Sequence, residues 1–139
     1  MRVYYEDTDA GGVLYHAAVI RYMDRGRTEW LRNHGHTLAA LEQEHQRVFA
    51  VHSLSARYLL PGRLDDELTV RTRLSGRARL SLDFEQSLWR GDECLAEATV
   101  KVACLSTEDW SPAPLPSDLY EQCKNNGGNY VRKLTNGEP

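Results

Sequence analysis

Regular alternation of apolar and polar side chains through the middle of the chain limits what it can fold into. From Leu68 to Ser75 the even positions form one largely apolar series, while arginine, serine and threonine occupy the odd ones. Because successive side chains of a strand point to opposite faces, this pattern predicts strands with one dry and one wet face. The alternation resumes after a turn expected around Gly76, and again after residues 91–92, and continues to Cys104. We therefore predict consecutive long strands that are joined by short turns and paired antiparallel.

One long helix is expected to cover the dry face of this sheet. A β-rich segment over Val48–Tyr58 precedes the alternating strands, and a short strand over Val3–Glu6 would raise their number to about five. Apolar side chains recur at helical spacing from about His16 to His34, with Gly35 as the expected C′ glycine. Since the apolar face of an antiparallel sheet has to be covered, the pattern predicts an α+β fold with this helix packed on the sheet.

The length of 139 residues fits a single domain. We expect residues 1–124 to form it, with further short helices over Thr37–Glu44 and Ser117–Lys124, and residues 125–139 to be a disordered polar tail. A net charge of -3 and 41% hydrophobic residues are typical of a soluble globular protein and do not favour a nucleic-acid partner. No apolar run approaches the roughly 18–20 residues of a membrane span, so we expect a cytoplasmic protein.

The cysteine pattern predicts reduced thiols. Cys94, Cys104 and Cys123 are an odd number at wide spacings, which suits neither a disulfide framework nor a zinc ribbon. We interpret Cys94 and Cys104 as small core residues.

The loop from Tyr4 to His16 is the strongest candidate for chemistry, because it places three carboxylates within four residues ahead of the long helix. Such carboxylates can bind a metal, supply a base or cap a helix, and composition does not choose among these roles. An EF-hand is not supported, because Gly11 and Ala18 stand where oxygen ligands are required. Gly11 also stands where a phosphatase loop needs a hydroxyl or branched residue. The sequence predicts neither a metal site nor a cofactor.

Backbone groups of this loop could also bind a substrate. Gly11 and Gly12 allow a tight turn and a close approach of the backbone to a ligand. The amides at the start of the following helix suit a polarised carbonyl oxygen. Serine-hydrolase, P-loop and zincin motifs do not occur in the sequence.

These segments resemble a known family. Residues 3–17 and 21–32 look very like those of the YbgC-type acyl-CoA thioesterases, which belong to the hot-dog superfamily together with 4-hydroxybenzoyl-CoA thioesterase. The likeness continues through residues 58–66 to about Pro116. It implies a curved antiparallel sheet wrapped around one long helix, in agreement with the alternation. It also implies a homo-oligomer, a dimer or a tetramer, with active sites at the subunit boundary, and it suggests a link to phospholipid metabolism and the Tol–Pal system.

The resemblance implies which residues act on an acyl-CoA substrate. Asp9 matches the family's nucleophile or general base, and His16 and Tyr5 occupy the other catalytic positions. Arg77 and Arg79 stand where related enzymes place basic residues near the nucleotide, and cationic side chains suit the phosphates of coenzyme A.

From the residues themselves, the amide of His16 could stabilise an oxyanion, its imidazole could position water or protonate the thiolate, and Tyr5 could orient either group. Structural alternatives stay open at each position. Asp9 could cap the helix, the His16 and Tyr5 side chains could be structural, and the two arginines could be ordinary exposed turn residues.

Two other functions compete with hydrolysis. A hydroxyacyl-thioester dehydratase of the same fold usually carries a His-Phe-Pro segment, which this sequence does not contain. A non-catalytic module that binds acyl-CoA or acyl carrier protein at the cell envelope would have no need for the Asp9 carboxylate. The resemblance is compatible with short-chain, longer-chain or carrier-protein thioesters. The first strand begins almost at the first residue of the chain, so we expect it to be short or frayed.

Overall fold

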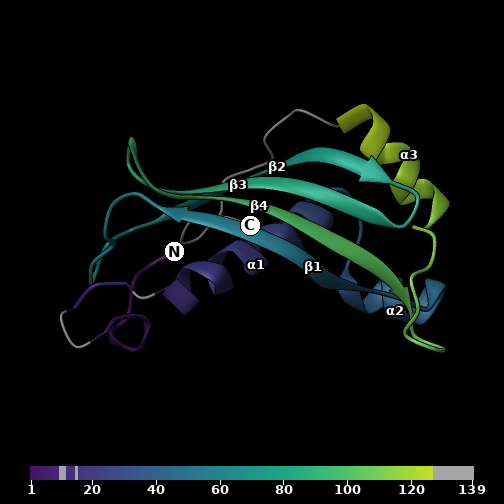
Figure 1. Ribbon diagram of the computed structural model, residues 1–139, viewed down its shortest axis with the longest axis horizontal. Coiled ribbons are helices and arrows are strands. Elements are labelled where there is room, and N and C mark those ends of the chain that lie inside the picture. The colour runs from purple at the N-terminus through teal and green to yellow at the C-terminus, as the bar shows by residue number, and fades with distance from the viewer. Residues whose placement is uncertain (10–11, 15, 127–139) are drawn as a thin grey trace.

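A four-stranded antiparallel sheet lies along one long helix in the computed structural model, which describes residues 1–9, 12–14 and 16–126. The strands follow the order β1-β4-β3-β2 across the sheet (Figure 1). The predicted α+β class is confirmed. The elements are η1 (Tyr5–Asp7), α1 (His16–Asn33), α2 (Leu38–His45), β1 (Arg47–Tyr58), β2 (Thr69–Ala78), β3 (Ser81–Arg90), β4 (Glu93–Ser106) and α3 (Ser117–Asn126).

Residues 3–6 do not form the fifth strand that the sequence suggested. Val3 exchanges backbone hydrogen bonds of 3.0 and 2.9 Å with residues 65 and 66, so the chain starts beside that segment. The pairing stops there, because the chain turns into the 3-10 helix η1. The carboxylate of Asp7 accepts a hydrogen bond of 3.0 Å from the Tyr4 amide and stabilises this turn. The described part of the chain therefore has four strands rather than about five.

The turn expected around Gly76 lies further along the chain. Strand β2 continues to Ala78, and its register against β3 shifts between Leu74 and Gly76. This irregularity absorbs the break in the alternation, so the strand passes through the glycine instead of ending there. The two residues 79 and 80 form the actual connection, since Ala78 pairs with Ser81.

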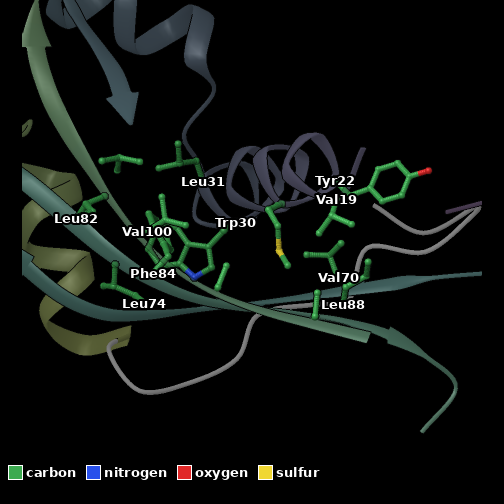
Figure 2. Packing of buried hydrophobic residues seen from close by; sticks show 14 of the residues in the cluster. Val19, Tyr22, Trp30, Leu31, Val70, Leu74, Leu82, Phe84, Leu88 and Val100 are labelled. Atoms are coloured by element: carbon green, nitrogen blue, oxygen red, sulfur yellow. The ribbon is translucent and has the colours of Figure 1, made fainter. Parts of the chain in front are cut away.

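The apolar core lies between α1 and the inner face of the sheet (Figure 2). Trp30 packs edge-on against Phe84, with ring centroids 5.2 Å apart and an interplanar angle of 79°. Helix and sheet approach closely at Gly26, where an added Cβ would lie 2.7 Å from Val70 Cγ1. Only glycine permits this approach. The labelled side chains of Figure 2 that fill the space are Val19, Tyr22, Trp30, Leu31, Val70, Leu74, Leu82, Phe84, Leu88 and Val100.

Helices α2 and α3 pack at the end of the sheet away from the start of α1 (Figure 1). Thr37 caps α2 by accepting a hydrogen bond of 3.1 Å from the Ala40 amide. Helix α3 docks onto β2 through Arg77, whose guanidinium lies 3.9 Å above the Tyr120 ring and donates a hydrogen bond of 2.9 Å to the Tyr120 carbonyl oxygen. Both short helices were predicted. Most of the expected tail, residues 127–139, lies outside the described residues.

All three cysteines are free thiols, as predicted. Cys104 and Cys123 are buried and Cys94 is half-buried. Burial raises the pKa of Cys104 and of Cys123 to about 11, so both thiols are protonated at neutral pH and act as small apolar residues. Among the described helices, none combines the length and the apolar character needed to cross a bilayer.

Candidate active site

A cavity of about 280 Å³ opens where α1 begins. Three separate parts of the chain form its walls: the loop before α1 with the first turns of that helix, the end of β1 with the turn after it, and the facing ends of β3 and β4. Most of the side chains that line it are aliphatic, with an imidazole and a phenol among them, so it suits an apolar chain that ends in a polar group. The lining residues are Val13, Leu14, His16, Val19, Tyr58, Leu59, Leu60, Pro61, Gly62, Leu88, Leu95 and Ala96.

Backbone hydrogen bonds hold the wall that follows β1. The amides of Leu59 and Leu60 both donate to the Leu95 carbonyl oxygen, at 2.8 and 3.1 Å, which fixes this segment to β4. The Leu14 amide donates to the Gly62 carbonyl oxygen at 2.7 Å. A Cβ on Gly62 would lie 2.9 Å from Leu14 Cδ2, so glycine allows the two walls to meet.

Asp9 lies in a tight turn next to the cavity. Its amide donates to the Val13 carbonyl oxygen at 2.9 Å, and the Gly12 amide donates to the Asp9 carbonyl oxygen at 3.0 Å. Gly12 has a φ of 76°, the left-handed conformation expected of a glycine here. The Asp9 side chain is exposed, and its Oδ1 accepts a hydrogen bond of 3.3 Å from the Val13 amide. The predicted contribution of Gly11 lies outside the described residues.

Asp7, which sequence analysis did not single out, attaches this loop to α1. It is 5% exposed, and its Oδ2 accepts hydrogen bonds from the Tyr22 hydroxyl at 2.7 Å and the Tyr4 amide at 3.0 Å. Its Oδ1 accepts from the Arg21 guanidinium in an ion pair. Burial, reinforced by the hydrogen bond to Asp7, raises the pKa of Tyr22 above its ordinary value. Tyr22 could have pointed to Asp7 from the sequence, because a tyrosine on the buried face of a helix needs a hydrogen-bond partner for its hydroxyl.

His16 is the first residue of α1 and lies at the cavity. Its ring stacks on that of Tyr58, the last residue of β1, with centroids 4.3 Å apart and an angle of 21° between the planes. The stack joins the helix side of the cavity to the sheet side. Tyr58 is a site residue that the sequence analysis missed, because 41 positions separate the two rings along the chain.

The other predicted residues are not part of the cavity lining in a single chain. Tyr5 is 74% exposed, and neither it nor Asp9 belongs to the lining. Arg77 contacts Tyr120, and Arg79 is exposed in the connection between β2 and β3. Figure 1 shows this connection at the end of the sheet where α3 packs, whereas the cavity lies where α1 begins. The structure thus brings His16 to the cavity and places Asp9 in the adjoining turn.

Comparison with known proteins agrees with this architecture. The family model described as "Thioesterase superfamily" matches residues 11–97. The chain is 43% identical over 119 residues to the acyl-CoA thioesterase YbgC of Haemophilus influenzae, covering 86% of this chain and 88% of that protein. It is 39% identical over 125 residues to the acyl-CoA thioester hydrolase YbgC of Escherichia coli O157:H7, covering 89% and 92%.

Solved structures show the same fold. The crystal structure of a probable thioesterase from Bartonella henselae matches with a TM-score of 0.80 and 33% identity, covering 84% of this chain and 95% of that one. A hypothetical protein from Thermus thermophilus matches with a TM-score of 0.84 and 26% identity, covering 93% and 95%.

Proposed function

The chain belongs to the thioesterase superfamily, with the hot-dog fold and the YbgC-type sequence pattern, and from this we propose that it hydrolyses acyl-CoA to a free acid and coenzyme A. One observation carries the proposal: an aliphatic cavity ends at the first residue of a long helix, and the turn that holds Asp9 adjoins it. The cavity suits the acyl chain, and the helix start suits the thioester carbonyl.

The reaction needs a polarised carbonyl and an attacking oxygen. Amides in the first turn of α1, that of His16 first among them, would donate to the carbonyl oxygen as it becomes negative, and the helix dipole favours that charge. Asp9 takes the proton of an attacking water, or attacks the carbonyl carbon itself. The tetrahedral intermediate then collapses, the C–S bond breaks, and the thiolate leaves. If Asp9 itself attacks, this step leaves a mixed anhydride on Asp9, and water then hydrolyses it to the free acid and restores the carboxylate. The His16 imidazole positions the water or gives a proton to the thiolate, and Tyr5 orients one of these groups.

A second copy of the chain is the proposed partner that completes the site. Strand β1 is an edge strand of 12 residues, and its outer edge has no neighbouring strand within the described chain. Val51 on this strand is 49% exposed. Long exposed edges are paired or protected in native proteins, and a second β1 would continue the sheet. In such an oligomer, Arg79 of one subunit could contact the phosphates of a coenzyme A molecule bound in the cavity of another subunit. Arg77 could do the same if it leaves Tyr120. The acyl donor can be coenzyme A or acyl carrier protein.

Replacement of Asp9 by asparagine tests the proposal. Asp9→Asn keeps the size of the side chain and one acceptor oxygen for the Val13 amide, but it removes the charge. Loss of a general base typically lowers the rate about 10²- to 10⁴-fold. We expect kcat to fall by that amount, measured as thiol release from acyl-CoA substrates ranging from acetyl to palmitoyl and from 4-hydroxybenzoyl-CoA, with circular dichroism unchanged.

A control variant and a second test variant sharpen this experiment. Asp109→Asn alters an exposed aspartate in the loop between β4 and α3 and should leave kcat unchanged. Arg79→Ala should raise the KM for acyl-CoA at low salt without lowering kcat. Full activity of Asp9→Asn would refute the role of the carboxylate. Binding of acyl-CoA without any turnover, also with carrier-protein thioesters, would favour the non-catalytic binding module instead.

A further inference from the structure

The imidazole of His16 differs from the two histidines at the far end of α1 in its hydrogen bonds. His34 stacks on Trp30, and its Nδ1 also lies 2.7 Å from the Trp30 carbonyl oxygen, while His36 Nε2 is hydrogen-bonded to the Gln122 side chain. His16 stacks nearly parallel on Tyr58, and within the described residues neither of its ring nitrogens forms a hydrogen bond. The stack therefore restrains the ring while both nitrogens are available to water or substrate.

Tyr58 is itself held firmly by the sheet. It pairs with Ala96 in the ladder between β1 and β4, and the next amide, that of Leu59, donates to the Leu95 carbonyl oxygen at 2.8 Å. Tyr58 is 42% exposed and lines the cavity, so it lies at the cavity surface rather than in the core. An exposed histidine at the start of a helix would otherwise distribute over several χ1 rotamers. A parallel aromatic surface selects the rotamer that keeps the imidazole over the cavity.

We propose that Tyr58 is a positioning residue that acts through His16: its ring holds the imidazole at the cavity in the orientation used for hydrolysis. This inference rests on the role of His16 in the proposed function. A side chain that is present only part of the time in its active orientation contributes only in proportion to that population. Without the stacking ring, the His16 side chain would divide its time among several rotamers. The kcat should therefore fall by a factor about equal to the number of these rotamers, roughly three- to tenfold.

The test compares Tyr58→Phe with Tyr58→Leu, each in the wild-type and in the His16→Ala background. Phenylalanine keeps the stacking ring and should retain kcat within about twofold of wild type. Leucine keeps the aliphatic lining but loses the ring, so kcat should fall roughly three- to tenfold while KM stays nearly constant. In the His16→Ala background, Tyr58→Leu should cause no further loss, because two residues that act as a unit are not additive.

A second measurement follows the stack without substrate. The ring of Tyr58 should shift the side-chain proton resonances of His16 upfield in NMR spectra recorded at one fixed pH. We expect this ring-current shift in the wild type and in Tyr58→Phe, and its loss in Tyr58→Leu.

Several results would overturn the proposal. These are full kcat in Tyr58→Leu, equal losses in Tyr58→Phe and Tyr58→Leu, and an equal loss caused by Tyr58→Leu with and without His16. Full activity of His16→Ala would refute the role of His16 in the proposed function, and Tyr58 would then have no residue through which to act. A missing ring-current shift in an active wild-type enzyme would refute the stack and with it the role of Tyr58, but it would leave the proposed hydrolysis intact.

Discussion

Replacing the buried carboxylate of Asp7 by an amide tests how the loop with Asp9 is attached to the fold. The two oxygens of Asp7 accept from three donors, which are the Tyr22 hydroxyl, the Tyr4 amide and the Arg21 guanidinium. Asparagine offers one acceptor oxygen, and its NH₂ group is a donor. In Asp7→Asn, at least one of the three donors therefore faces another donor.

The cost follows from the burial of each partner. If the amide oxygen takes the place of Oδ2, it keeps Tyr22 and Tyr4 but loses the charge that strengthens both bonds, at about 0.5–1 kcal/mol each. Arg21 then faces the NH₂ group, but its side chain is 43% exposed and can turn into water, so this loss is about 0.5–1 kcal/mol. The free energy of unfolding should fall by about 1.5–3 kcal/mol. This is less than the removal of one partner from a fully buried ion pair.

Urea unfolding followed by circular dichroism, at one protein concentration, measures this change. Glu6→Gln is the matched control, because Glu6 is an exposed acid of the same 3-10 helix and should leave stability unchanged. Arg21→Gln should cost no more than about 1 kcal/mol. We also expect a lower kcat in Asp7→Asn, since the turn that carries Asp9 keeps the Tyr22 hydrogen bond to α1 but loses the Arg21 ion pair. A stability within about 0.5 kcal/mol of wild type would refute the reasoning, because that is the usual effect of an ordinary surface substitution.

Two further predictions concern α1 and the sheet beneath it. Gly26→Ala should lower the free energy of unfolding by about 1–3 kcal/mol although alanine favours helices by about 1 kcal/mol, because the new Cβ would lie 2.7 Å from Val70 and 2.9 Å from Gln86. In urea unfolding, a smaller loss in the Val70→Ala background would support this clash, and an unchanged stability of Gly26→Ala would contradict it. The fold raises the pKa of the Tyr22 hydroxyl, whereas an unfolded tyrosine has a pKa of about 10. Above about pH 10 the unfolded chain therefore loses the Tyr22 proton while the folded chain keeps it, and this favours unfolding. Stability should therefore be complete below that pH and decline above it, and Tyr22→Phe should flatten this part of the profile; an unchanged slope would exclude Tyr22 as the cause.

The sheet and its main helix were predictable because their signals are local. Alternation over Leu68–Ser75 and helical spacing from His16 report directly which face of each element is buried. The two errors arose where contacts distant in sequence decide the backbone. The short strand over residues 3–6 is replaced by a turn that Asp7 caps, and α1 in turn holds the Asp7 carboxylate. The register shift at Gly76 depends on the pairing with β3, which the pattern of one strand does not specify.

The site was only partly predictable for the same reason. Asp9 and His16 lie in one contiguous motif, so a single stretch of sequence identified both. Tyr58 belongs to the site only because the end of β1 reaches the start of α1 in three dimensions. The predicted roles of Tyr5, Arg77 and Arg79 stay predictions, since none of the three lines the cavity of its own chain.

Stability and activity should separate cleanly among these residues. The loop is attached to α1 through the buried Asp7, and the opposite wall is attached to β4 through the Leu95 carbonyl oxygen. Substitutions at such attachments affect both the free energy of unfolding and the geometry of the site. Asp9 is exposed, and the asparagine variant retains an acceptor for the Val13 amide. Asp9→Asn should therefore lose activity at unchanged stability, whereas Asp7→Asn should lose both, and this contrast separates a residue that acts on substrate from one that positions it.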